Sequence, residues 1–172
     1  MRRLALILFL AAVAVPAVAV AADRNANDGV FELRAANGTV ILAGKGVLWG
    51  QIDNGSLRVT DQTSSVTGPA QQLLVSGAEH TRPIGEDVTV YSGLNLTFRM
   101  PAGGKYRIRF KGLGLDLTAI GVGTADMIGD PTLFTTGRYA LDSGKWQAVP
   151  LLEKVVTFGL QPPAPLGSLT GP

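Results

Sequence analysis

The stretch LNLTFRMPAGGKYRIRFK, residues 94–111, has the clearest strand pattern in the sequence. Apolar and polar side chains alternate on both sides of its PAGG segment, which is typical of a half-buried β-hairpin. A two-residue glycine loop would mix basic and apolar groups on one face, so parity favours a three-residue loop, Ala102-Gly103-Gly104. This loop predicts that Met100 lies opposite Tyr106.

The polar face of the predicted hairpin is almost entirely basic. In the expected register Arg99 lies opposite Arg107, and like charges directly opposite each other destabilise a pair of strands. One interpretation is a solvated face that protects a sheet edge. The other is a binding face for an anionic wall polymer, lipopolysaccharide or phospholipid headgroups. The candidate binding residues on this face are Arg99, Lys105, Arg107, Arg109 and Lys111.

Residues 1–22 have the order of a secretory signal peptide. Arg2 and Arg3 precede an apolar run from Leu4 to Val15, and small residues follow until polarity begins at Asp23. A membrane anchor is the alternative, but the run is shorter than the ~20 apolar residues that a spanning helix needs. We therefore expect cleavage near residue 22, a mature chain without a transmembrane span, and a secreted, extracytoplasmic location.

The charge balance of the mature chain is neutral. Two of the 15 Lys and Arg residues precede Asp23, so residues 23–172 carry 13 bases and 13 acids. The basic pI therefore belongs largely to the precursor and gives no reason to expect nucleic-acid binding. Nor does the basic face contain an aromatic side chain that would stack on bases. The chain has no cysteine, so it is stable without disulfides, which favours a bacterial envelope or extracellular protein.

The sequence predicts an all-β class: an antiparallel β-sandwich built from hairpins, with a partly open β-barrel as the alternative. The chain has 22 glycines, 10 prolines and almost no helix-forming stretch after residue 23. We expect one β-domain over residues 23–160 and a disordered Pro- and Gly-rich tail over 161–172. Besides 94–111, the core is expected from a hairpin over 47–60 that turns at Asn54-Gly55, and one over 138–149 that turns at Ser143-Gly144.

The residue types argue against most enzyme chemistry. His80 is the single histidine, and the chain has neither a cysteine nor a Gly-x-Ser-x-Gly element. No cofactor is indicated, and no metal site is predicted. Glu86-Asp87 and the pair Asp126 and Asp130 are the best calcium-ligand candidates, but they lack the dense loop pattern of a calcium site.

The glycine pairs in the chain are interpreted as conformational. Gly121-Val122-Gly123 lacks the remaining elements of a phosphate loop. The segments AGKGVLWGQIDNG and AIGVGTADMIGD share a G-x-G, but two matches are fewer than a repeat architecture needs.

Trp49 is the best single candidate for stacking on a sugar. The predicted hairpin places it on a face with Gln51, Asp53 and Arg58, whereas Trp146 is expected in the core beside Leu141. A carbohydrate-binding or carbohydrate-active domain that uses Trp49 and nearby carboxylates is therefore an alternative function.

The segments GKGVLWGQIDNGSLRVTD, FRMPAGGKYRIRFKGLGLDLTAIG and RYALDSGKWQAVP, after a signal peptide, resemble those of small secreted bacterial β-proteins of unassigned function. The resemblance transfers no catalytic or binding residue. From the residues themselves we expect an exported, non-enzymatic β-domain that is a structural or binding module of the bacterial envelope or extracellular space. The sequence leaves the ligand and the oligomeric state open.

Overall fold

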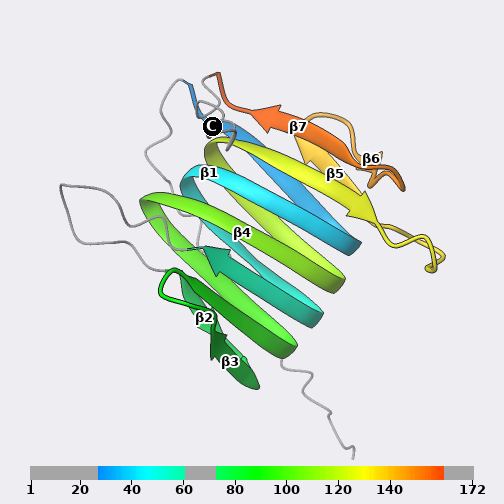
Figure 1. Ribbon diagram of the computed structural model, residues 1–172. Helices are drawn as coiled ribbons and strands as arrows, with labels where there is room; N and C mark the ends of the chain where they lie inside the picture. The colour runs from blue at the N-terminus through cyan, green and yellow to red at the C-terminus, as the bar shows by residue number, and fades with distance from the viewer. Residues whose placement is uncertain (1–26, 61–72, 161–172) are drawn as a thin grey trace, which may run out of the picture.

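The computed structural model describes residues 27–60 and 73–160 (Figure 1). These residues form one antiparallel sheet of seven strands that is not closed into a barrel. Two strands are very long, with 32 residues in β1 and 42 in β4, and the other five contain two to five residues each. The strands are β1 Gly29–Thr60, β2 Leu74–Ser76, β3 His80–Pro83, β4 Val88–Gly129, β5 Arg138–Leu141, β6 Gln147–Ala148 and β7 Lys154–Phe158.

The long strands β1 and β4 wind around a common axis as an antiparallel pair, and we call this double-wound β-structure the coil. Most β1 residues therefore have two partners in β4, one on each side. Val40, for example, lies opposite both Phe110 and Met127, which are 17 residues apart along β4. One turn of the coil thus takes about 17 residues of β4.

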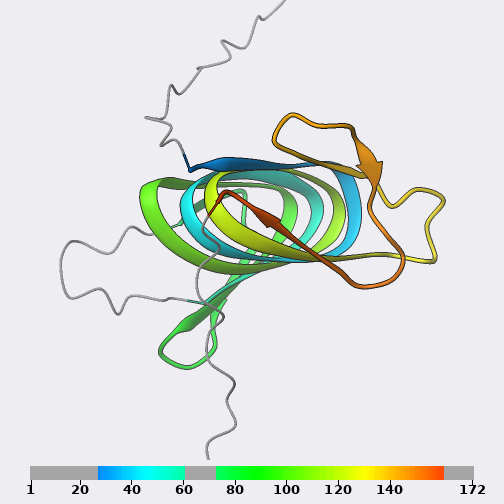
Figure 2. The ribbon, with the colours of Figure 1, turned by 90° about the horizontal axis from the view of Figure 1, so that it is seen from above.

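The coil is flattened, so it has two broad sides that enclose the core (Figure 2). The Arg109 side, which faces the viewer in Figure 1, contains residues 38–45 and 55–60 of β1 and 88–93, 105–112 and 122–129 of β4. Strands β3 and β7 flank it. The Trp49 side contains 29–37 and 47–54 of β1 and 94–103 and 113–120 of β4, with β2 and β5–β6 at its borders.

Glycines occupy the corners where the chain passes from one side to the other. At Gly46 and Gly121, which lie opposite each other, φ is 147° and 143°, values that favour glycine. A Cβ on Gly46 would lie 2.0 Å from the carbonyl oxygen of Ile120, and one on Gly121 would lie 2.1 Å from that of Lys45. Adjacent turns therefore touch through bare backbone. The paired glycines are Gly29 with Gly121, Gly38 with Gly112 and Gly129, Gly46 with Gly104 and Gly121, and Gly55 with Gly93 and Gly112.

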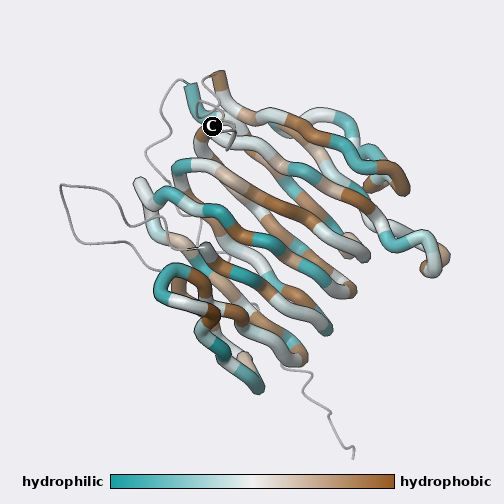
Figure 3. Tube along the Cα trace, in the orientation of Figure 1, coloured by the Kyte–Doolittle hydropathy of each residue, from teal (hydrophilic) through white to brown (hydrophobic). Residues whose placement is uncertain are grey.

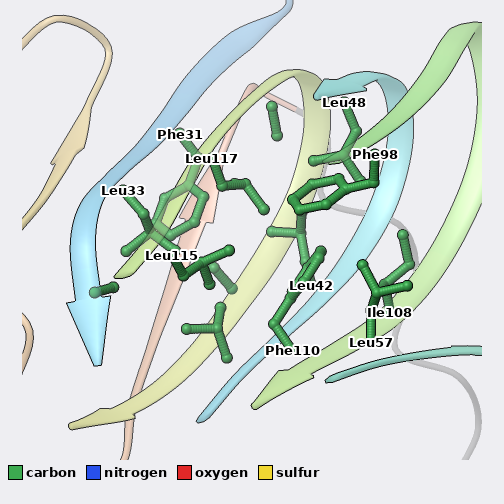
Figure 4. Packing of buried hydrophobic residues seen from close by; sticks show 14 of the residues in the cluster. Phe31, Leu33, Leu42, Leu48, Leu57, Phe98, Ile108, Phe110, Leu115 and Leu117 are labelled. Atoms are coloured by element: carbon green, nitrogen blue, oxygen red, sulfur yellow. The ribbon is translucent and has the colours of Figure 1, made fainter. Parts of the chain in front are cut away.

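The core lies between the two sides and is entirely apolar apart from tyrosine hydroxyls (Figure 4). Side chains alternate between the interior and the surface along both long strands, as the period of a β-strand requires. Phe98 and Phe110 come from opposite sides of the coil, and their ring centroids are 4.9 Å apart. The predicted division of faces over 94–111 is confirmed for the six buried residues Leu96, Phe98, Met100, Tyr106, Ile108 and Phe110.

The hairpins predicted over 94–111 and 47–60 are wrong. Both stretches lie within uninterrupted strands, and Met100 lies opposite Leu48 instead of Tyr106. Residues 101–103 form a bulge at a corner, and Gly55 is a corner within β1. Asn54-Gly55 and Gly103-Gly104 bend the chain in the structure, as they would in a hairpin. The strand continues past each bend because β1 and β4 provide partners for each other. Leu94, expected inside, is 52% exposed.

The third predicted hairpin exists with a different turn. Asp142 and Ser143 are its central residues, with φ of 49° and 60°, and the Gly144 amide donates to the Leu141 carbonyl over 2.7 Å. Tyr139 consequently lies opposite Gln147 instead of Ala148. Trp146 is not a core residue. It is half-buried, and the Arg34 guanidinium lies 4.4 Å from its ring centroid.

The signal peptide, its cleavage site and the tail over 161–172 lie outside the described residues.

The corner geometry predicts a steep and position-specific cost for added Cβ atoms. We expect Gly46→Ala to lower the free energy of unfolding by roughly 3 kcal/mol or more, because strain at positive φ adds to the contact with Ile120. The matched control is Gly103→Ala, where φ is 82° but nothing lies within 4 Å of the new Cβ. It should lose only about 1–2 kcal/mol. Urea unfolding of the parent and the two variants measures both losses in unfolding free energy. Equal losses would contradict the close backbone contact at the Gly46 corner.

Candidate functional site

Cations gather on the Arg109 side. Arg107, Arg109 and Lys111 point outward there, on a β4 stretch whose polar residues alternate with buried ones. Figure 3 shows the hydrophilic positions of this stretch beside those of the neighbouring β1 stretch. The structure adds two cations that the sequence reasoning did not include, Arg58 and Lys45. We call Lys45, Arg58, Lys105, Arg107, Arg109 and Lys111 the basic surface.

Like charges lie directly opposite each other twice in the basic surface. Arg58 is opposite Arg109, and Lys45 is opposite Lys105 next to the Gly46 corner. Cβ atoms of such directly opposite residues are roughly 5 Å apart, and like-charged pairs at this distance destabilise a sheet. Within residues 27–60 and 73–160, no ion pair joins Arg58, Arg107 or Arg109 to an acid. No carboxylate of the described residues therefore pairs with these arginines to offset the repulsion.

The basic surface does not protect a sheet edge. Residues 107–112 of β4 lie between two stretches of β1 and have hydrogen-bonded neighbours on both sides. The edge-protection interpretation is therefore wrong for these residues. The Arg109 side ends instead at β3 and β7. Arg82 of β3 lies two strands from Arg58, beyond Val90, and extends the positive charge toward that border.

Acids on the same side gather toward β7. Asp126 lies opposite Ile41, which separates it from Arg109. A hydrogen bond and charge repulsion from Asp126 raise the pKa of the exposed Glu153 carboxyl. Hydrogen bonds from Thr132, helped by the charge of Lys111, lower the pKa of Asp130. The Arg109 side thus has a basic centre and an acidic border.

Arg99 is not part of the basic surface, contrary to the sequence prediction. The corner at 101–104 carries it to the Trp49 side, where it lies opposite Trp49 and Leu74. Arg107, its predicted partner, lies opposite Ala43 and Thr60 on the other side of the coil. The same kind of correction applies to Arg58, which the sequence grouped with Trp49 and which the Gly55 corner carries to the Arg109 side.

A groove of about 710 Å³ crosses the Trp49 side. Trp49, 37% exposed, lies between Arg99 and Thr118 of the adjacent β4 stretches. The next outward position along β1 is Gln51, between Thr97 and Asp116. The outward-facing lining residues are Glu32, Arg34, Trp49, Gln51, Leu74, Ser76, Thr97, Arg99, Asp116 and Thr118.

Asp116 is held in place by two hydrogen bonds at the floor of this groove. Its Oδ1 accepts from the Ala35 amide over 2.7 Å, and its Oδ2 accepts from Gln51 Nε2 over 3.3 Å. Ala35 has φ of 46° where the β1 register shifts, so the carboxylate also stabilises a bulge. The sequence placed Asp116 among candidate carboxylates without indicating that it would lie beside Trp49.

The remaining sequence candidates do not converge. His80 is exposed in β3, and within the described part of the chain no three potential metal ligands of the His, Cys, Asp and Glu types lie together. Gly121 and Gly123 lie opposite Gly46 and Gly44 in the sheet, so this G-x-G is part of a strand. The Tyr106 hydroxyl is buried and has no hydrogen-bond partner among the described residues, and burial raises its pKa. It faces the core and not either surface.

The chain matches no protein-family model, none of the curated proteins compared with it and no solved structure. Among the described residues, no helix is long and apolar enough to cross a membrane.

Reversing one charge in the basic surface should raise stability. Arg58→Glu converts its like-charged pair with Arg109 into an opposite-charged one, so we expect a gain of about 1 kcal/mol in unfolding free energy at low salt. The gain should disappear near 1 M salt, where the screening length falls to about 3 Å.

Arg99→Glu serves as the control for this prediction, because Arg99 lies opposite Trp49 and Leu74 and has no charged partner directly across. Its effect should stay within about 0.5 kcal/mol. Denaturant titrations at both salt concentrations measure these changes. A loss of stability in Arg58→Glu at low salt would show that the two arginines do not repel each other.

Proposed function

We propose that this protein is an exported, non-enzymatic module of a bacterial envelope that binds an anionic polymer or an anionic lipid surface through its basic surface. The observation that carries the proposal is the cross-strand pairing of Arg58 with Arg109 and of Lys45 with Lys105, with no acid from residues 27–60 or 73–160 paired to the arginines. An arrangement that is unfavourable for the free protein becomes favourable when an anion lies between the like charges.

Phosphate is the shared chemistry that this surface fits. Arginine binds phosphate through two parallel hydrogen bonds, and lysine binds it as a point charge. Neighbouring strands lie ~4.8 Å apart, so the cations form a two-dimensional array that contacts several anionic groups at once. Each contact is weak when exposed, and the array provides affinity through their number.

Nucleic acid fits this surface less well. None of the uncharged residues directly opposite the cations on adjacent strands is aromatic, so none stacks on a base; they are Thr39, Ile41, Ala43, Ser56, Thr60, Val90 and Val122. Phosphodiester polymers of the cell wall and anionic phospholipids require no such stacking. The proposal therefore names these two sources of the same chemistry.

The class and location of the protein complete the proposal. The two sides of the coil enclose a single apolar core, which supports classing the fold as a β-sandwich. The order of residues 1–22 supports export, as does the resemblance to small secreted bacterial β-proteins.

Charge reversal on the basic surface tests the proposal. Arg107→Glu/Arg109→Glu should weaken binding to vesicles of phosphatidylglycerol and to poly(glycerol phosphate) by at least tenfold at ~0.1 M salt, where screening acts over about 10 Å. Sedimentation with vesicles measures binding to the lipid, and calorimetry measures binding to the polymer. Binding to only one probe identifies the source, and binding to both assigns the shared phosphate chemistry.

The matched control is Arg99→Glu/Arg138→Glu, which makes the same change in net charge on the opposite side of the coil. This variant should bind like the parent. Equal losses of affinity in the two double variants would show that binding depends on net charge alone, and would contradict a specific binding surface. Unchanged binding in Arg107→Glu/Arg109→Glu, or a parent protein that ignores both probes, would overturn the proposal.

A further inference from the structure

We propose that the groove on the Trp49 side is a second binding site, which takes a neutral β-1,4-linked polysaccharide chain. The site lies on the opposite side of the coil from the basic surface and shares no residue with it. The outcome of a test on this groove is therefore independent of the outcome for the basic surface.

Trp49 provides the stacking platform. The residue is 37% exposed on the middle strand of the groove, between Arg99 on one neighbouring strand and Thr118 on the other. A tryptophan surrounded by polar residues on an outward sheet face has no core to fill. An aromatic face with polar groups around it matches a pyranose ring, whose axial hydrogens form an apolar surface bordered by hydroxyls.

Polar side chains line the groove beside Trp49. Asp116 and Gln51 are joined by a hydrogen bond of 3.3 Å and are therefore oriented before a ligand arrives. The carboxylate retains lone pairs that accept from hydroxyls, and the Gln51 carbonyl oxygen is a further acceptor. Preorganisation of this kind lowers the entropic cost of binding.

The charge of the groove favours a neutral ligand. Its lining contains two basic residues, Arg34 and Arg99, and two acidic residues, Glu32 and Asp116. Arg34 already lies over the Trp146 ring, with 4.4 Å between the guanidinium carbon and the ring centroid. A phosphate chain would meet the two carboxylates without a surplus of positive charge, so the polyanion of the basic surface is not expected here.

The length of the groove favours a chain over a single sugar. The lining runs across the strands from β2, through the β4, β1 and β4 stretches, to the first stretch of β1. Four strand spacings correspond to ~19 Å, which accommodates a short oligosaccharide. Equatorial β-1,4 linkages keep successive rings in an extended ribbon, a shape that suits a groove running across several strands.

The experiment uses the full mature chain with Trp146→Phe, which leaves Trp49 as the single tryptophan and keeps an aromatic face for Arg34. The probes are hexasaccharides of β-1,4-linked glucose, xylose and N-acetylglucosamine, each at millimolar concentration. At least one should shift the Trp49 fluorescence. Calorimetry on the chain without this change should then show roughly tenfold weaker binding for Trp49→Ala and for Asp116→Ala.

Leu94→Ala is the matched control, because Leu94 is an exposed apolar residue of the same side that does not line the groove. It should bind like the parent, and circular dichroism should show the same strand content in every variant. The proposal is overturned if no hexasaccharide perturbs Trp49, or if Trp49→Ala binds as tightly as the parent. A proline-rich peptide that binds with the same dependence on Trp49, in place of the sugars, would overturn the ligand class.

Discussion

Backbone contact between glycines at the corners of the coil is the constraint on which the rest of the structure depends. A β-strand of 42 residues encloses a core only if it bends repeatedly, and each bend brings the next turn against the previous one. At Gly46 and Gly121 there is no room for a Cβ on either strand. Since corners of β1 and β4 lie opposite each other, the glycine spacing of the two strands must agree, which fixes their register.

The corners also decide which charged residues share a surface. Arg99 and Arg107 belong to one basic stretch of sequence, but the bulge at 101–104 separates them onto opposite sides of the coil. Arg58 and Lys45 join Arg107 and Arg109 from another strand. The like-charged pairs of the resulting basic surface are unfavourable for the stability of the free protein. The same winding leaves the Trp49 side with balanced charge, so the two sides offer different chemistry.

The alternation of apolar and polar residues correctly predicts which side chains are buried, but it does not predict which strands pair. The period of two identifies inward residues such as Phe98, Ile108 and Phe110, because this alternation holds for any strand with one buried face. Asn54-Gly55 and Gly103-Gly104 also have the chemistry of tight turns, and a local reading pairs the residues on either side. Their partners come instead from a strand distant in sequence, which no local signal reveals.

Two signals in the sequence did point toward the coil. Glycines recur every eight or nine residues at 29, 38, 46 and 55 and again at 104, 112, 121 and 129, which is half of the 17-residue turn. The similarity between the two G-x-G segments has a structural basis, because Gly44 and Gly46 lie opposite Gly123 and Gly121. The candidate site required this long-range information: the sequence placed Arg107, Arg109 and Lys111 together, but the coil was needed to exchange Arg99 for Arg58.

Disulfide trapping tests the winding most directly, because the chain has no cysteine of its own. Arg58→Cys/Arg109→Cys places two thiols on directly opposite residues, where Cα atoms are roughly 4.5–5.5 Å apart and a disulfide is permitted. Arg99→Cys/Arg107→Cys would be opposite only in a local hairpin. The coil predicts that mild oxidation gives an intramolecular disulfide in the first variant and none in the second. Efficient disulfide formation in the second variant alone would contradict both the coil and the surface built on it.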